Sequence, residues 1–589
     1  MRMDLVKSEM RKLNGIAVSP GIALGRLRVI DRRHIAVEEY SVTPEGVNAE
    51  IDRLKSAIQS ARDELSALKD QLQASVGDEH LFFIDTHLMI LTDERLFSEA
   101  SANIKTGLIN AECALRRTLH KYREIFTGID DAYLRERIND VETVIEKILR
   151  NMVGVPHAPI IPDGGQTIIV GHDFSPADLL QMDRSRIIGM VTEVGGKTSH
   201  ASILARAFEL PAVAGVDEAA GQMLDGAPVI IDGHNGLVIL NPDRATFIEY
   251  LQLQRRDKYL ESELLKLALL PSETRDGHRI SLKGNVEVPE EGASVLRHGG
   301  EGVGLYRTEM LFMNRPQMPD EEEQYQVYKS MLLAISPHPL TIRTLDAGGD
   351  KLLEGTSRQI EQNPALGVRA IRMSLSMPEE FKKQLRAILR VSTYGEVKIL
   401  LPMISGLEEL RLAKRLLEEA KQNLQKSGID FDQNIQVGIM IEIPSAVVLA
   451  DLLARECDFF SVGTNDLIQY SLAVDRTNEH LSDMYQPLHP AVLRSLRQIV
   501  VSAKKYGIDS CICGEMAGDP QYLPVLLGLG FNELSMGATS LLKVKQLLRR
   551  CTKKQAEIIT DACFEFCTAA EVDDFLKSSI KSHFSECID

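Results

Sequence analysis

The chain has 589 residues, of which 44% are hydrophobic and 26% charged, as expected for a globular protein of about three or four domains. Its formal net charge of -17 argues against broad binding to nucleic acid or anionic membranes, because phosphate surfaces would repel it. No run of about 18 apolar residues predicts a membrane span. The charged opening MRMDLVKSEMRKLNG is unlike a secretory leader.

The eight cysteines do not form the pattern of a disulfide framework. Most of them lie near the C-terminal end of a long chain, which is typical of reduced thiols in a cytoplasmic protein. Cys511 and Cys513 are spaced like a metal or redox pair, but no second pair at ligand spacing accompanies them. We therefore expect a cytoplasmic protein without a cysteine metal site.

The spacing of apolar residues changes twice in the first half of the chain. A short β-like opening, NGIAVSPGIALGRLRVI, gives way to apolar residues spaced by three and four, which predicts an all-helical block over 43–151. Short β-rich runs separated by turns then return. We therefore expect an α/β domain built from 1–42 and 152–244, with the helical block inserted into it.

A charged helical stretch over 245–270 predicts a linker helix, and 271–589 shows one regular rhythm of apolar runs and helices. Eight strand-like runs that alternate with helices favour a (β/α)₈ barrel. An open, doubly wound sheet is the alternative. The eight runs are 280–286, 302–309, 340–348, 397–404, 437–444, 459–466, 510–515 and 533–537.

Polar residues stand where nearly every one of these runs ends, and the active site of such a barrel lies at the carboxyl ends of its strands. Arginines offer forked donors for phosphate oxygens, carboxylates are ligands for Mg²⁺, and a protonated thiol can donate a proton. Each residue alone could be a surface charge or a structural ion pair. Together they predict a site for a small phosphate ester held through Mg²⁺. These residues are Asn285, Arg307, Glu309, Arg343, Asp346, Glu442, Asn465, Asp466, Arg476, Cys513 and Glu515.

His200 stands in GGKTSHASILAR, where two glycines permit a turn and Thr198 or Ser199 can cap a helix that starts near it. A helix N-terminus favours an anion, so a neutral imidazole there could carry a phosphoryl group. A buried core histidine is the plainer alternative. A metal role with His172 or His234 lacks ligand spacing.

Seven motifs bear on this choice, and they are GGKTSHASILAR, GLYRTEMLFM, IRTLDAGGDK, NPALGVRAIR, IMIEIPSA, FSVGTNDLIQYSLAVDR and CICGEMAG. Together, and in this order along the whole chain, they resemble enzyme I of the bacterial phosphoenolpyruvate-dependent sugar phosphotransferase system. The resemblance implies Mg²⁺-dependent phosphoryl transfer from phosphoenolpyruvate to the enzyme's own histidine and then to the carrier protein HPr. It also implies release of pyruvate, a mobile α/β domain and a homodimer formed through the barrel.

The resemblance also implies roles for individual residues. His200 would be the phosphorylated histidine and Cys513 the acid that protonates enolpyruvate. Glu442 and Asp466 would hold Mg²⁺. The residues implied to bind phosphoenolpyruvate are Arg307, Arg343, Arg369, Asn465 and Arg476. The segment THLMILTDERL resembles the carrier-docking segment, which implies contacts with HPr from His87, Leu88, Met89, Asp93 and Glu94.

Two positions depart from the pattern. Lys197 stands where many relatives have arginine, and Leu179 stands where some have a hydroxyl near the active histidine. Three kinds of rival protein share parts of this pattern. Pyruvate phosphate dikinase and phosphoenolpyruvate synthase need a nucleotide-binding domain, for which this chain has no room. The nitrogen-regulatory paralogue of enzyme I usually carries an extra N-terminal sensory domain, and a non-catalytic phosphorelay scaffold would not need the intact site residues.

Overall fold

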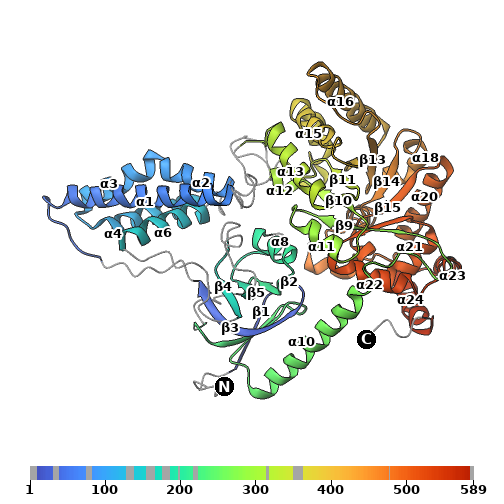
Figure 1. Ribbon diagram of the computed structural model, residues 1–589, viewed down its shortest axis with the longest axis horizontal. Helices are drawn as coiled ribbons and strands as arrows, with labels where there is room; N and C mark the ends of the chain where they lie inside the picture. The colour runs from blue at the N-terminus through green and yellow to red at the C-terminus, as the bar shows by residue number, and fades with distance from the viewer. Residues whose placement is uncertain are drawn as a thin grey trace. The chain divides into compact units, whose positions relative to one another are not determined.

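The structure is a computed structural model in which the chain divides into two compact units, Met1–Lys258 and Tyr259–Asp589. Figure 1 traces both units. Among the described residues, no helix is both long and apolar enough to span a membrane. The structure describes residues 10–30, 39–73, 82–127, 138–153, 166–174, 186–196, 199–216, 223, 225–312, 317–348, 363–476 and 478–583.

The first unit contains a bundle of helices, drawn in blue in Figure 1. Buried residues on α1 recur at spacings of three and four (Leu54, Ala57, Ala61 and Leu65), so one stripe of this helix faces the bundle core. Asp93 is the N-cap of α3, where its side chain accepts a hydrogen bond from the Arg95 amide. The helices are α1 (Val47–Gln73), α2 (Phe82–Thr92), α3 (Glu94–Gly107), α4 (Ala111–Thr127) and α6 (Ile138–Val153).

An eight-stranded sheet forms the rest of the first unit, in the order β1-β8-β7-β3-β4-β5-β6-β2. Strands β3 and β4 are parallel neighbours, with Arg26 opposite Thr167, although the helical bundle separates them in sequence. The bundle is therefore an insertion between two adjacent strands, as predicted. The strands are β1 (Arg11–Asn14), β2 (Ile16–Ser19), β3 (Ile22–Ile30), β4 (Thr167–Gly171), β5 (Ile187–Thr192), β6 (Ala212–Ala214), β7 (Pro228–Asp232) and β8 (Leu237–Leu240).

Two helices matter for function around this sheet. Helix α8 (His200–Ala207) follows β5 and leads back to β6. Helix α10 (Arg244–Leu265) follows the last strand and corresponds to the predicted linker helix; none of its residues is buried. Its first half nevertheless contacts the sheet, because Tyr250 packs on the apolar cluster around Ile22 and Gln254 donates to the Ile22 carbonyl at 2.7 Å.

The second unit is a closed barrel of eight parallel strands, and β16 pairs back onto β9 with Glu533 opposite Ser281. This closure confirms the (β/α)₈ prediction and shows that the open, doubly wound alternative is wrong. The strands are β9 (Ser281–Val286), β10 (Val303–Arg307), β11 (Leu340–Arg343), β12 (Val397–Leu401), β13 (Gln436–Ile441), β14 (Phe459–Val462), β15 (Asp509–Ile512) and β16 (Glu533–Met536).

Helices surround the barrel because their apolar stripes pack on the outward-facing residues of the strands. The helices are α11 (Glu291–Arg297), α12 (Glu309–Phe312), α13 (Glu321–Ala334), α14 (Ile371–Ser376), α15 (Pro378–Val391), α16 (Leu407–Lys426), α17 (Pro444–Val448), α18 (Ala450–Leu453), α19 (Thr464–Leu472), α20 (Pro490–Tyr506), α21 (Leu523–Leu529), α22 (Ala538–Leu548), α23 (Lys553–Cys563) and α24 (Ala569–His583).

A small apolar cluster fills part of the barrel interior. It packs Cys513 against inward-facing residues of four strands, so the thiol lies on an apolar floor below the polar strand ends. The other members are Leu305, Leu400, Met440 and Phe459.

Candidate active site

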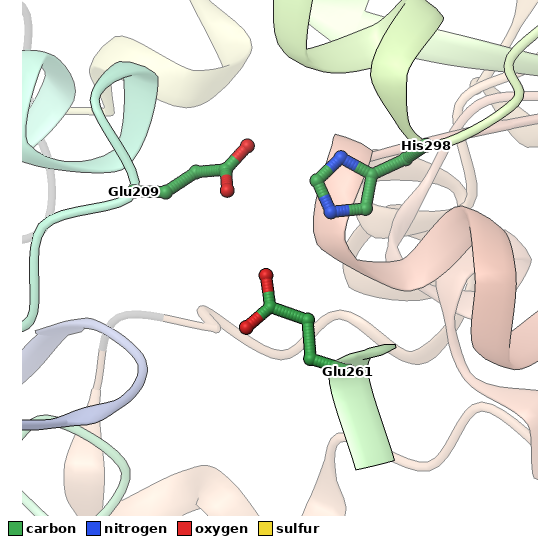
Figure 2. A group of neighbouring side chains, drawn as sticks. All are labelled: Glu209, Glu261 and His298. Atoms are coloured by element: carbon green, nitrogen blue, oxygen red, sulfur yellow. The ribbon is translucent and has the colours of Figure 1, made fainter. Parts of the chain in front are cut away.

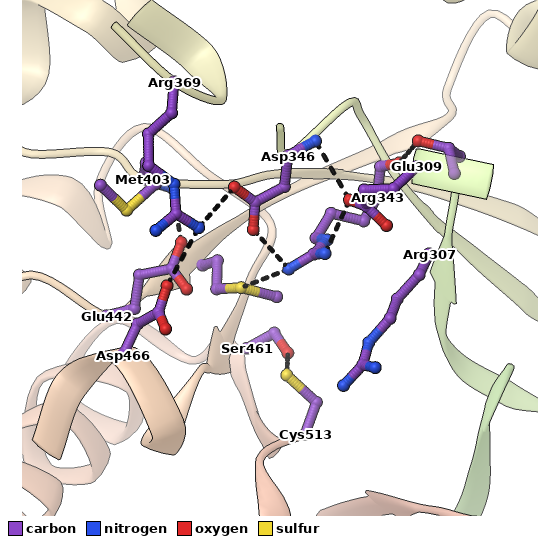
Figure 3. Close-up of polar contacts among 12 residues, drawn as sticks. Arg307, Glu309, Arg343, Asp346, Arg369, Met403, Glu442, Ser461, Asp466 and Cys513 are labelled. Atoms are coloured by element: carbon purple, nitrogen blue, oxygen red, sulfur yellow. Dashed lines mark hydrogen bonds and ion pairs between the residues drawn. The ribbon is translucent and has the colours of Figure 1, made fainter. Parts of the chain in front are cut away.

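The carboxyl ends of the barrel strands gather most of the polar residues that the sequence singled out (Figure 3). Arg307 and Arg343 are the last residues of β10 and β11, and Cys513 directly follows β15. Glu442 follows β13, and Asp466 lies in the first turn of α19, just after β14. All parallel strands end at the same rim, which explains why residues so far apart in sequence meet here.

Arg343 is locked in place by two carboxylates. Its Nη2 atom lies 2.7 Å from Oε1 of Glu309, and its Nη1 atom lies 2.7 Å from Oδ2 of Asp346. Only 12% of the Arg343 side chain is exposed. Because both neighbours hold the guanidinium, its orientation is fixed before any ligand binds.

Arg369 reaches the same cluster from a loop rather than from a strand end. Its Nη2 atom donates to Asp346 at 2.8 Å and to Asp466 at 3.2 Å, while Nη1 donates to the Tyr470 hydroxyl at 3.3 Å. The next residue, Ala370, has φ of 52°, a conformation that costs a residue with a Cβ atom about 1–3 kcal/mol. This strained backbone turns the chain so that Arg369 enters the site.

The carboxylates of the cluster respond differently to their surroundings. Burial by itself would raise the pKa of Asp346, but the nearby charges of Arg343 and Arg369 outweigh it and lower the pKa below its ordinary value. Burial and the negative charges of Asp346 and Asp466 instead raise the pKa of Glu442 to about 8. Glu442 also accepts a hydrogen bond of 2.6 Å from the Met403 amide.

Glu442 and Asp466 fit a divalent cation. Both are buried, and Figure 3 shows their carboxylates side by side. The raised pKa of Glu442 reflects like charges that a cation would offset, and Mg²⁺ typically takes one or two carboxylates plus substrate oxygens. A Cβ atom at Gly463 would lie 2.6 Å from Oε2 of Glu442, so only glycine leaves this carboxylate its place.

The surroundings of Cys513 favour the protonated form of its thiol. It is 2% exposed, and burial raises its pKa to about 11. The Ser461 hydroxyl donates to Sγ at 3.2 Å, and Sγ lies 3.5 Å from the Val462 carbonyl, to which it donates. The sequence pattern did not point to Ser461, because its position in the alternation of β14 is that of a core residue.

The remaining predicted barrel residues lie around this centre. Arg307 is paired with Glu287 at 2.6 Å, and Asn465 exchanges two hydrogen bonds with Glu515 at 3.0 and 3.1 Å. Arg476 is exposed, with Nη2 at 3.9 Å from Asp466. Arg476 is thus the most loosely held of the predicted ligands.

Asn285, which the sequence also placed at a strand end, serves the site indirectly. Its side-chain amide donates to the Cys513 carbonyl at 2.9 Å, and its side-chain oxygen accepts from Ser535 at 2.6 Å. This bond ties the end of β9 to the residue after β15, so Asn285 positions the backbone that carries the thiol.

In the first unit, His200 is the first residue of α8, and Ser199 is its N-cap. The Ser199 hydroxyl accepts from the Ser202 amide at 3.4 Å and donates to the Ser202 hydroxyl at 2.7 Å, so the predicted helix start is confirmed. The side chain of His200 lies outside the described part of the structure, as do Lys197 and Leu179.

His172 and His234, the two histidines weighed as metal partners of His200, each have a carboxylate partner. Nδ1 of His172 lies 2.9 Å from Glu193, and Nε2 of His234 lies 3.0 Å from Asp257. These pairs give both histidines local structural roles.

In the second unit, Figure 2 draws Glu261 of α10 and His298, which follows α11. Burial lowers the pKa of His298, and its Nδ1 atom lies 2.9 Å from the Ser294 carbonyl of its own helix, an acceptor for Nδ1–H. His298 is therefore held as a helix-end residue. Glu209, which is also drawn, belongs to the first unit.

The residues predicted to contact a carrier lie on neighbouring helices. Met89 on α2 is 58% exposed, while Leu88 packs against the bundle core. His87 is half-buried, and Asp93 and Glu94 are exposed at the start of α3. Asp93 already serves as the cap of α3, so Met89 and Glu94 are the exposed members of this set that do not cap a helix.

Comparison with known proteins gives the same picture of the chain as a whole. Three family models match it: the PEP-utilising enzyme N-terminal model over residues 14–137, the mobile-domain model over 164–236 and the PEP-binding-domain model over 261–553. The mobile-domain match contains His200, and the PEP-binding match contains the whole barrel rim described above.

Full-length relatives agree with these matches. The phosphoenolpyruvate-protein phosphotransferase of Bacillus subtilis (strain 168) is 40% identical over 574 residues, covering 97% of this chain and 100% of its own. That of Priestia megaterium is 40% identical over 569 residues, with 97% and 99% covered. That of Haemophilus influenzae is 38% identical over 565 residues, with 96% and 98% covered. The chain therefore belongs to the phosphoenolpyruvate-protein phosphotransferase family.

Proposed function

We propose that this protein transfers the phosphoryl group of phosphoenolpyruvate to its own His200 and then to a histidine on an HPr-type carrier, releasing pyruvate. In this role it catalyses the first step of a sugar phosphotransferase system. The observation that carries the proposal is the barrel rim, where three arginines and two carboxylates surround a protonated thiol in a chain of this family.

The arginines bind the substrate. Arg343 and Arg369 are pre-oriented by Asp346, and Arg307 is directed by Glu287, so their donors are fixed for the phosphate and carboxylate of phosphoenolpyruvate. Asn465, at the start of α19, and Arg476, just beyond its end, complete the site. Glu442 and Asp466 would hold Mg²⁺, which when bound would neutralise phosphate charge.

The transfer itself requires a nucleophile and an acid. The neutral imidazole of His200 forms the new N–P bond while the P–O bond to the enolate of pyruvate breaks. The Cys513 thiol gives its proton to the methylene carbon of that enolate, which yields pyruvate, and the thiolate then regains a proton from solvent. The fixed arginines stabilise the negative charge that spreads over the phosphoryl oxygens.

The second transfer involves the helical bundle. We propose that His87, Leu88, Met89, Asp93 and Glu94 dock the carrier, with Met89 as an exposed apolar contact and the acidic pair facing a basic carrier surface. His200 must then receive the phosphoryl group at the barrel and deliver it at the bundle. The first unit therefore changes its position relative to the barrel between the two steps.

Three further features complete the proposal. The domain limits are 1–42 with 152–244, 43–151, 245–270 and 271–589. The described cysteines are free thiols, which supports a cytoplasmic location. Dimerisation through the barrel rests on the resemblance to enzyme I, and sedimentation of the purified protein tests it.

One labelling experiment tests the function. The purified protein is incubated with ³²P-phosphoenolpyruvate and Mg²⁺ in the absence of nucleotide, beside a His200→Ala variant and a His234→Ala control. We expect acid-labile label on the parent and on the control but none on His200→Ala, and transfer of the label to added HPr. An unlabelled parent, or a labelled His200→Ala variant, would refute the proposal.

A further inference from the structure

A fully buried lysine donates hydrogen bonds to the backbone at the end of the linker helix. Lys545 on α22 is 2% exposed, and its ammonium donates to three backbone carbonyls: Ala268 at 3.0 Å, Leu270 at 2.9 Å and Gly299 at 3.1 Å. An ammonium has three N–H donors, so each donor of Lys545 has a partner. Lysine is almost never fully buried without such compensation, which marks this arrangement as specific.

Two of the three acceptors belong to the chain that follows α10. Past the end of this helix at Leu265, the backbone continues in tighter i→i+3 bonds, such as Ala268 to Leu265 at 3.1 Å. The carbonyls at the end of a helix carry partial negative charge and lack partners of their own. The Lys545 ammonium gives these carbonyls hydrogen-bond donors and a positive charge.

Two neighbours tighten the same junction. Nη1 of Arg549, one turn further along, donates to the Pro271 carbonyl at 2.7 Å. Gly299 has φ of 71°, and a Cβ atom there would lie 2.4 Å from the Ala268 carbonyl oxygen. The turn before β10 thus packs directly against the linker end.

The junction lies at the opposite end of the barrel from the chemistry. Gly299 precedes β10 and Pro271 precedes β9, so both stand at the amino ends of strands. Arg307, Arg343 and Cys513 stand at the carboxyl ends. A change at Lys545 therefore contacts none of these site residues directly.

We infer that Lys545 is a positioning residue that fixes the barrel end of the linker, so that movement of the first unit is confined to the chain before Ala268. The inference rests on the proposed function, because the two transfer steps require that movement. The first half of α10 is held to the sheet of the first unit, where Tyr250 packs on the apolar cluster around Ile22 and Gln254 donates to the Ile22 carbonyl at 2.7 Å. The anchor at Lys545 therefore sets the barrel-side limit of the segment about which the linker turns.

The test uses the full-length protein and the variant Lys545→Met, which keeps the apolar stem but loses all three donors. Lys543→Met is the matched control, because Lys543 lies on the same helix and is exposed. Hydrogen–deuterium exchange reports the amides of 266–270, calorimetry reports phosphoenolpyruvate binding with Mg²⁺, and rapid quench reports phosphorylation of His200.

For Lys545→Met we expect exchange at 266–270 to be faster by about tenfold or more. Phosphorylation of His200 should be slower by about tenfold, while the Kd for phosphoenolpyruvate stays within about twofold of the parent value. Lys543→Met should match the parent in all three measurements.

Three results would overturn the inference: unchanged exchange at 266–270, unchanged phosphorylation, or a loss of phosphoenolpyruvate binding that parallels the loss of phosphorylation. The last would mean general damage to the barrel. If Lys545→Met does not fold, Arg549→Gln is used instead, because it removes one hydrogen bond of the same junction. The same three measurements on this variant and on Lys543→Met then test the anchoring role. A parent that takes no label refutes the proposed function instead, while the exchange data still decide the anchoring role.

Discussion

The Nη2 atom of Arg369 lies 3.2 Å from Oδ2 of Asp466, so a residue proposed to bind phosphate holds one of the two proposed cation ligands. The same nitrogen also holds Asp346 at 2.8 Å. A phosphate that draws Arg369 toward itself would free the Asp466 carboxylate. With these proposed roles, a single side chain would couple substrate binding to cation binding.

Replacing Arg369 with glutamine separates these two roles. Because the variant loses charge-assisted bonds to phosphate, we expect phosphoenolpyruvate to bind about 10- to 100-fold more weakly. Mn²⁺, used as a paramagnetic probe, should bind the substrate-free variant more tightly, since Asp466 no longer has a competing guanidinium. Calorimetry and electron paramagnetic resonance measure the two affinities, with Arg372→Gln on α14 as control. Weakened Mn²⁺ binding by the Arg369 variant would contradict the coupling.

The Cys513 thiol should keep its proton over an unusually wide pH range. Its pKa of about 11 lies above the ordinary value of 9.0, so an acid role requires the form that predominates at every pH below about 11. We expect no fall in pyruvate formation around pH 9 that depends on this residue. Steady-state pH profiles of the parent and of Cys513→Ser measure this.

Removing the thiol should abolish pyruvate formation while phosphoenolpyruvate still binds. Cys513→Ala should lower kcat by about 10²- to 10⁴-fold, the usual range for loss of a general acid, with Kd changed little. Ser461→Ala, which removes the hydroxyl 3.2 Å from the sulfur, should have a much smaller effect. Unchanged turnover in Cys513→Ala would remove its acid role.

Gly463→Ala should damage the proposed cation site without touching a charged residue. The added methyl group would stand 2.6 Å from Oε2 of Glu442 and must push the carboxylate aside. We expect Mg²⁺ and Mn²⁺ to bind about tenfold more weakly, because divalent ions depend on ligand position. Gly406→Ala is the control, since a Cβ atom there meets nothing within 4 Å. Equal cation affinity in both variants would show that Glu442 is not a ligand.

Met89→Asp tests the docking segment on α2. Met89 is 58% exposed, so a charge there should not unfold the bundle but should oppose an apolar contact with the carrier. We expect a rise of about tenfold in the KM for HPr, with phosphorylation of His200 by phosphoenolpyruvate unchanged. Ile125→Asp on α4 is the matched control, because Ile125 is 52% exposed and lies outside the proposed segment. A similar rise in both variants would contradict a specific contact at Met89.

The sequence predicted the barrel well because its strands are short, apolar and regularly spaced. Each of the eight predicted runs begins within one residue of the first residue of an observed strand. The run 280–286, for example, contains the strand Ser281–Val286. The parallel arrangement then placed Arg307, Arg343 and Cys513 at one rim, since polar residues stand where nearly every run ends. Local pattern and global topology agree in this half of the chain.

The contacts between side chains could not be predicted, because they depend on loops and on backbone geometry. Arg369 reaches Asp466 only because Ala370 takes a positive φ, which no residue preference indicates for alanine. The amide that holds Glu442 belongs to Met403, another residue with positive φ. The three carbonyls around Lys545 come from two distant turns, so nothing near Lys545 in sequence marks them.

The pairing of the first strands with the last ones has a consequence for how the chain acquires its structure. Arg11 of β1 pairs with Leu240 of β8, and β3 pairs with β4 across the whole helical bundle. Such distant partners close large loops, which makes folding slow, whereas the bundle is built from contacts between helices that are near in sequence. During synthesis the bundle can fold as soon as α6 emerges, while the sheet must wait for β8. The edges of its early strands stay exposed until then, which leaves them open to pairing with other chains during synthesis.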